Sequence, residues 1–233
     1  MSAERTALVG FGARHLAVAT IGAAIAYLFW LTRGHWDPEM RLWKAIGDAS
    51  LVLLYATLAS GALARLKLPG GRLVRYRREL GIWFALYGLL HAVLILNGWA
   101  RWDLSRFLGY EFVPELGRLV RLEPGFGLSN LIGVTAGVIA LLLLATSSDR
   151  AIRRLGATRW KLLHQGTYVV LWLTVLHVAY FLFIHYTEHF HRAPPAPDWF
   201  RYPFVAMTVA LIGLQAWAFL STTRSRTRDP VTP

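Results

Sequence analysis

Apolar residues in this sequence come in six long blocks rather than in short alternating runs. Each block covers about 20 positions, the number that an α-helix needs to cross roughly 30 Å of hydrocarbon at 1.5 Å per residue. Blocks of this length are typical of transmembrane helices and not of amphipathic helices on a soluble core. The predicted spans are residues 13–31, 45–64, 80–99, 127–146, 162–184 and 204–220.

These blocks predict an all-α membrane protein, a six-transmembrane-helix bundle that forms one domain over residues 1–233. We expect a core of about residues 13–221 and a disordered C-terminal tail over residues 222–233, because that tail is polar. The chain contains no cysteine. Disulfides, thiolate nucleophiles, iron–sulfur clusters and cysteine-ligated zinc are therefore excluded.

The formal net charge of +12 is unevenly distributed between the connections. Residues 65–78 hold six Lys and Arg without an acid, residues 147–161 hold five against one Asp, and residues 224–228 hold three more Arg. The alternate connections balance their charges. The positive-inside rule then places both termini in the cytoplasm, and tryptophans near the opposite ends of the spans resemble an interfacial belt.

The arginine clusters could also bind phosphates or nucleotides, but membrane orientation explains them without a further assumption. The sequence has no P-loop and no G-x-G-x-x-G strand–turn–helix unit. We therefore expect the lipid bilayer as a partner and no nucleic acid. A flavin or nicotinamide donor would be a separate protein.

Two of the eight histidines lie at matching depths in spans that run in the same direction. His91 is 13 residues beyond Arg78, and His177 is 16 residues beyond Lys161, so their depths differ by about 5 Å. Ionisable residues inside a membrane are costly and usually functional. Two imidazoles on neighbouring helices suit the axial ligation of a haem iron, although each could instead only bond a neighbouring helix.

His164 is harder to interpret. It lies 13 residues before His177, a rise of about 20 Å, but about 140° around an ideal helix, so the two do not share a face without a kink or bulge. The residue 13 before His91 is Arg78, so a four-histidine ladder for two haems is incomplete. His15 stays open as a replacement ligand, and His164 stays open as a contact of a propionate, flavin or quinone.

A third group of histidines follows the fifth span at positions 185, 189 and 191, with Glu188 among them. Histidines four residues apart on a helix can hold a divalent metal. The alternative that we favour is a solvated end of the span.

The stretch "RRELGIWFALYGLLHA", followed by "LGATRWKLLHQGTYVVLWLTVLH", resembles the ferric-reductase-like transmembrane superfamily and its compact haem-binding bacterial branch, the MsrQ family. "DPEMRLWKAIGDASLVLLYATLASGALARL" adds to a resemblance that covers about residues 34–184. It implies six spans in the bacterial inner (cytoplasmic) membrane, haem b, and His91, His164 and His177 as cofactor ligands, with His164 serving a second haem if there is one.

The resemblance also implies partners. Electrons would come from a cytoplasmic flavin reductase or the quinone pool, with FMN and quinone as further cofactors. They would pass to a periplasmic molybdenum-dependent methionine sulfoxide reductase catalytic subunit. The sequence departs from the family pattern in having three residues between Leu155-Gly156 and Trp160 and in its long loops 100–126 and 185–203.

Three functions follow from these observations. The first is a haem b electron-transfer subunit of an oxidoreductase system. The second is a stand-alone transmembrane reductase of ferric chelates, quinone or oxygen, for which the long loops argue. The third is a non-redox transporter or assembly factor with structural histidines, which would contain no haem.

Overall fold

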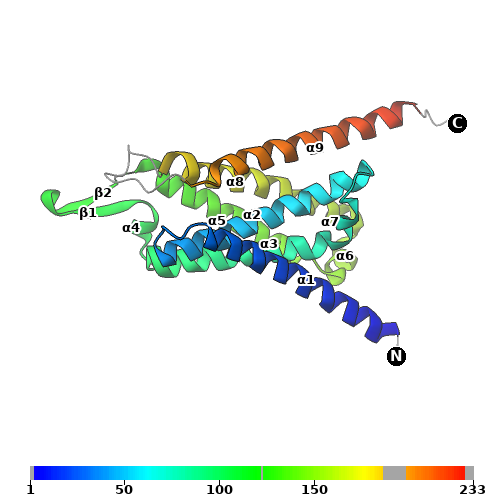
Figure 1. Cartoon of the computed structure of the whole chain (residues 1–233), viewed down its shortest axis with the longest axis horizontal. Helices are drawn as coiled ribbons and strands as arrows, with labels where there is room; N and C mark the ends of the chain where they lie inside the picture. The colour runs from blue at the N-terminus through cyan, green and yellow to red at the C-terminus, as the bar shows by residue number, and fades with distance from the viewer. Residues whose placement is uncertain (1–2, 122, 186–197, 229–233) are drawn as a thin grey trace.

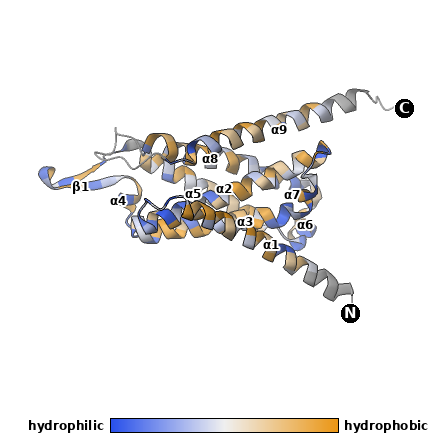
Figure 2. Ribbon diagram, in the orientation of Figure 1, coloured by the Kyte–Doolittle hydropathy of each residue, from blue (hydrophilic) through white to orange (hydrophobic). Residues whose placement is uncertain are grey.

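The protein forms an elongated helical bundle (Figure 1). The computed structural model describes residues 3–121, 123–185 and 198–228. Six helical stretches are long and apolar enough to cross a membrane, which confirms the predicted spans: Gly10–Leu31, Pro38–Arg65, Gly71–Ala100, Gly125–Ala145, Ala157–His185 and Arg201–Thr223. Figure 2 shows hydrophobic residues along the helices and hydrophilic ones gathered in the connections at the two ends.

The long helices are α1 (Ala3–Leu31), α2 (Pro38–Arg65), α3 (Arg77–Leu94), α5 (Pro124–Ala145), α8 (Gly166–Tyr180) and α9 (Arg201–Arg228). Helix α3 continues into a π-helical turn, η2 (Ile95–Ala100), and α8 continues into another, η4 (Phe181–His185). One end of the bundle, which we call the arginine-rich end, carries η1 (Gly71–Tyr76), α6 (Asp149–Leu155) and α7 (Ala157–His164). Helix α1 begins and α9 ends at the arginine-rich end (Figure 1).

The opposite end, which we call the hairpin end, carries α4 (Leu104–Phe107), η3 (Pro114–Leu116) and two strands, β1 (Tyr110–Val113) and β2 (Arg118–Arg121). The strands pair antiparallel, with Tyr110 opposite Arg121, and Gly117 closes their turn at a φ of 60°. The sequence predicted only a long loop here. The strands were not predicted because, at four residues each, they show at most two periods of apolar and polar alternation.

Two helix boundaries differ from the prediction. Helix α2 begins at Pro38, because Asp37 accepts hydrogen bonds from the backbone N–H groups of Glu39 and Met40 and proline fits the first helical position. We predicted a disordered tail from residue 222, but α9 continues to Arg228. Residues 229–233 lie outside the described residues.

Helix α2 is the centre of the bundle. Of its most apolar 18 residues, 61% are buried, compared with at most 28% in any other span. This central position explains how the span accommodates polar residues. The Ser50 hydroxyl donates to the carbonyl of Phe84 on α3 at 2.9 Å, and Asp48 joins a group of buried charges.

That group, the buried ion cluster, consists of Arg33, Lys44, Asp48 and Asp198. The fully buried Arg33 guanidinium lies 2.5 Å from Asp48 and 3.1 Å from Asp198, and the Lys44 ammonium lies 2.9 Å from Asp198. Burial by itself would raise the pKa of Asp198, but the charges of Lys44 and Arg33 and the N–H of Phe200 hold that pKa below its usual value. The cluster joins the α1–α2 connection to the start of α9.

We expect Asp198→Asn to lower the stability of the protein by about 3 kcal/mol at neutral pH, because it leaves buried cations short of one anion. The wild type gains this stabilisation above the pKa of Asp198 and loses it as the pH falls through that value. Thermal unfolding in detergent at neutral and acidic pH measures the difference, which should shrink on acidification. Asp149→Asn is the control, because Asp149 pairs with Arg78 on an exposed surface and should contribute less than about 1 kcal/mol. Equal unfolding midpoints for the wild type and Asp198→Asn would contradict the prediction.

Candidate functional site

His91 lies near the end of α3 and is held by α2. Its Nδ1 lies 2.9 Å from the backbone carbonyl oxygen of Trp43. A carbonyl can only accept, so Nδ1 carries the proton and Nε2 keeps its lone pair. The ring also lies against Gly47, where a Cβ would come within 2.9 Å of Nδ1. Only glycine leaves room for this ring position.

His177 on α8 repeats the arrangement against α5. Its Nδ1 donates to the carbonyl of Ser129 at 2.8 Å, and its ring lies where a Cβ on Gly133 would come within 2.8 Å. In both cases the acceptor precedes the histidine by 48 positions. Phe181 packs its edge on the His177 ring, with 5.0 Å between the ring centroids. Both histidines are therefore fixed in the same tautomer by the same kind of contact.

The two arrangements belong to an internal repeat with an offset of 86 positions. Helices α2 and α5 both begin at a proline, and the turns η2 and η4 begin at corresponding positions. Gly70 and Gly156 both have a positive φ. Identical residues at this offset include Leu42 and Leu128, Ile46 and Ile132, Gly47 and Gly133, Val52 and Val138, Leu58 and Leu144, Leu90 and Leu176, His91 and His177, and Leu96 and Leu182. The α2–α3 and α5–α8 units are two copies of one helical hairpin.

His91 on α3 and His177 on α8 occupy equivalent positions in the two copies, and the charge of one ring acts on the other. Within the described residues, neither Nε2 atom has a hydrogen-bond partner, whereas both Nδ1 atoms do. Two neutral imidazoles with open Nε2 atoms can ligate one metal centre from two sides. The depths of the two histidines in their spans predicted this pair, but they did not reveal the repeat. The repeat is visible in the sequence as identical residues at an offset of 86 positions.

His164 lies apart from this pair, at the arginine-rich end. Its Nε2 lies 3.2 Å from the hydroxyl of Thr146, which itself donates to the carbonyl of Leu142, so Nε2 is the protonated nitrogen. Trp160 stacks on the ring at 4.1 Å. The helix is interrupted at Gln165, between α7 and α8. His164 and His177 would need such an interruption to share one face, because the 13 positions between them amount to about 140° around an ideal helix.

A second haem would need a further histidine ligand beside His164, and the two candidate positions for it make other contacts. Arg78, the counterpart of His164 in the first copy, donates to the carbonyl of Ser147 at 2.7 Å and pairs with Asp149 at 2.9 Å. His15 on α1 packs on Phe11, and its buried Nε2 has no hydrogen-bond partner among the residues that the structure describes. A ligand role for His164 or His15 stays a prediction.

The predicted histidine run at the hairpin end is described only in part. His185 Nδ1 lies 2.8 Å from a carboxylate oxygen of Glu123, which also accepts a hydrogen bond from the Tyr180 hydroxyl. His189 and His191 lie outside the described residues. Within the described ranges, no group of three or more His, Cys, Asp or Glu could hold a metal ion.

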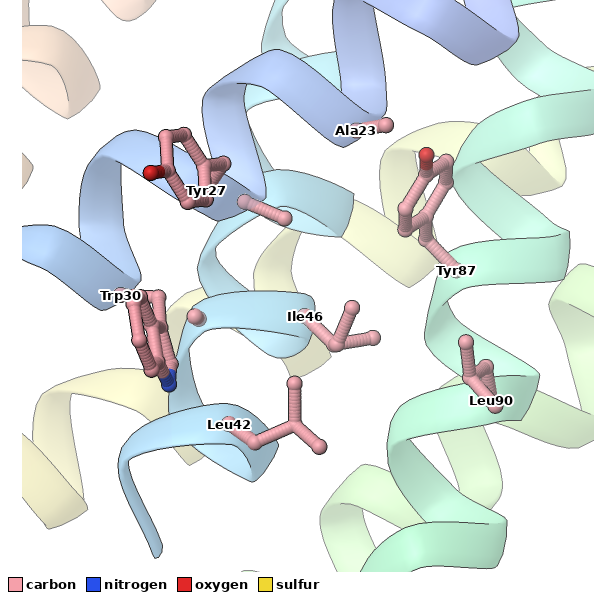
Figure 3. Close-up of a pocket in the computed structure, with 9 residues that line it drawn as sticks. Ala23, Tyr27, Trp30, Leu42, Ile46, Tyr87 and Leu90 are labelled. Carbon is pink, nitrogen blue, oxygen red and sulfur yellow. The ribbon is translucent and has the colours of Figure 1, made fainter. Parts of the chain in front are cut away.

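A shallow groove of about 470 Å³ lies between α1, α2 and α3. Figure 3 shows Tyr27 and Trp30 from α1 on one wall, Tyr87 and Leu90 from α3 on the other, and side chains of α2 between them. The groove is apolar, and neither His91 nor His177 is among the residues that line it.

Residues 43–175 match the family model of the ferric reductase like transmembrane component. The chain belongs to this family. The matched segment of the family begins at the residue that binds His91 through its carbonyl and contains His91 and His164. It ends two residues before His177. The predicted superfamily is therefore confirmed.

Curated relatives refine the family. The protein from Polaromonas naphthalenivorans is 28% identical over 204 residues, 88% of this chain and 82% of the relative. That from Ralstonia nicotianae is 29% identical over 181 residues, 78% and 72% of the two chains, and that from Azospira oryzae is 34% identical over 142 residues, 60% and 54%. Each bears the name protein-methionine-sulfoxide reductase heme-binding subunit MsrQ. No solved structure matches the chain.

Proposed function

We propose that this chain is a transmembrane electron-transfer protein that binds one haem b between His91 and His177. The observation that carries the proposal is the duplicated unit of carbonyl, glycine and histidine, which leaves two Nε2 atoms open in neighbouring copies of one helical hairpin. The relatives named as heme-binding subunits support it.

The residues present fit such a cofactor. Each Nδ1–H donates to a backbone carbonyl, which fixes ring orientation and raises the basicity of the ligating nitrogen. Gly47 and Gly133 let the rings settle against the helices behind them. Phe181 packs its edge on the His177 ring. When bound, the haem supplies a one-electron couple, and the chain needs no general acid or base.

The difference in basic residues between the two ends of the bundle gives the orientation of the protein in the membrane, and the orientation gives the direction of electron transfer. We place the arginine-rich end in the cytoplasm of a bacterial inner membrane. There it would meet a cytoplasmic flavin reductase or the quinone pool, and basic residues such as Arg75 and Arg154 would attract an anionic donor, FMN included. The hairpin end would then face the periplasm and a molybdenum-dependent methionine sulfoxide reductase, in agreement with the relatives' names. A second haem at His164 stays a prediction.

An absorbance spectrum of the purified protein tests the proposal. We expect dithionite to produce the sharp bands of a bis-histidine b-type haem and a pyridine haemochrome assay to count one haem per chain. In vesicles, reductant on one side should reduce an impermeant acceptor on the other at a rate that requires the haem. Colourless protein, or a haem without bis-histidine bands, would overturn the proposal and favour the non-redox alternative.

The alternative is a stand-alone reductase of ferric chelates, quinone or oxygen. The folded hairpin β1–β2 favours it, because it gives the hairpin end of the bundle a structured surface. Reoxidation of the prereduced protein separates the two functions. A conduit should be reoxidised rapidly by the oxidised methionine sulfoxide reductase and slowly by ferric citrate. The reverse order supports the alternative.

A further inference from the structure

The two copies of the helical hairpin differ in charge beside the histidines. Lys44 on α2 corresponds to Asn130 on α5 at the offset of 86 positions. Lys44 follows the residue whose carbonyl binds His91 and lies one helical turn from Gly47, towards the hairpin end. Its side chain is only 14% exposed, and its charge acts on both His91 and His177.

Asn130 offers no equivalent charge. Its side-chain amide donates to the carbonyl of Phe107 at 2.8 Å, so part of its donor capacity is used by the chain itself. The contacts of the two histidine rings are thus the same in both copies, but the residue one helical turn from the glycine differs. It is a cation, Lys44, on α2 and a neutral amide, Asn130, on α5.

We propose that Lys44 anchors one propionate of the haem, at the hairpin end of the site; this rests on the proposed function. The two propionates of a haem share one edge and are carboxylates, which are costly inside a membrane unless a cation or water meets them. In the other direction, the nearest basic residues before the histidines on their own spans are Arg78 and Lys161, 13 and 16 positions away. The propionate edge therefore faces Lys44.

The buried ion cluster positions Lys44 for this role. Asp198 pairs with the ammonium at 2.9 Å, and it also accepts hydrogen bonds from Arg33 at 3.2 Å and from the N–H of Phe200 at 3.0 Å. A propionate beside the Lys44 ammonium would therefore not leave Asp198 unpaired. Asp198 is a positioning residue, and Lys44 is the binding residue.

The copies predict unequal propionates. Lys44 and Asn130 occupy equivalent positions on α2 and α5, so a haem held by both histidines would have a charged donor on one copy and a neutral amide on the other. A propionate on the Lys44 side would be paired with a charge, and one on the Asn130 side would meet no charge from that residue.

The test compares purified full-length wild type with Lys44→Gln and Lys44→Arg. Lys67→Gln, which removes the same charge from an exposed turn at the arginine-rich end, is the control. Resonance Raman spectroscopy records the propionate bending bands, and transfer of haem to excess apomyoglobin gives the release rate. We expect Lys44→Gln to shift one of the two bands, keep the bis-histidine spectrum and release haem about tenfold faster, the loss of one charge-assisted hydrogen bond. Lys44→Arg should shift the same band and retain the haem.

Each result has one meaning. Unchanged bands and release rates in Lys44→Gln, or the same changes in Lys67→Gln, overturn the inference while the proposed function stands. If Lys44→Gln does not fold, Lys44→Arg decides, because an unchanged propionate band in that variant overturns the inference. Wild-type protein without a bis-histidine spectrum overturns the proposed function itself and the inference with it.

Discussion

His91→Ala and His177→Ala should each abolish haem binding, whereas His164→Ala should leave the haem between them in place. Each of the first two variants removes an open Nε2 atom from the pair, and the methyl group of alanine offers no replacement ligand. His164 is the last residue of α7, at the arginine-rich end of the bundle, and its Nε2 already donates to Thr146. Haem content by pyridine haemochrome and the Soret band of the purified variants measure the effect. We expect occupancy to fall at least about tenfold, which corresponds to about 1.4 kcal/mol.

The His164 variant is also the measurement that decides the number of haems. A wild type with two haems per chain and a His164→Ala variant with one would confirm the second haem that the sequence leaves open. Normal reduced spectra in both His91→Ala and His177→Ala would refute the proposed ligand pair.

Gly47→Ala and Gly133→Ala should lose the haem almost as completely, although both histidines remain. The added methyl group would lie 2.9 Å from the His91 ring in one variant and 2.8 Å from the His177 ring in the other, so the ring must move. Movement breaks the hydrogen bond to Trp43 or Ser129 and turns Nε2 away from its partner histidine. Alanine favours a helix over glycine by about 1 kcal/mol, so a loss of haem cannot be attributed to a weaker helix.

Gly137→Ala is the matched control for this prediction. Gly137 lies one turn from Gly133 on α5, and a Cβ there would have nothing within 4 Å. The control should bind haem like the wild type and unfold at the same or a slightly higher temperature. Haem retention in Gly47→Ala and Gly133→Ala equal to that in Gly137→Ala would show that the glycines do not set the ring positions.

The spans and the histidine pair could be predicted from the sequence because both depend on one-dimensional quantities. An apolar block of about 20 residues has few stable structures other than a transmembrane helix. The depth of a histidine follows from its distance to the nearest charged residue. For His91 and His177 this count predicts similar depths, since their spans run in the same direction, and their role as ligands stays a prediction.

Other features depend on contacts that no local pattern records. Arg33 and Asp198 are 165 positions apart and meet only when α9 packs beside α2. The tautomer of His91 depends on a carbonyl of the neighbouring helix. The partner of His164 is Thr146, which follows the end of α5 and has no distinguishing local sequence. The repeat differs from these features, because it was readable from the sequence and requires only a comparison of the chain with itself.

The repeat has a consequence for how the protein could have become directional. A pair of identical helical hairpins, assembled from separate chains, would surround a central cofactor with two equal halves, and every substitution would appear on both sides. Fusion in one chain removes that constraint, so one half could acquire Lys44 and keep Arg78 while the other acquired His164. The two histidines have stayed alike in both halves. The divergence of the halves makes the two faces of the site unlike, while both copies still cross the membrane in the same direction.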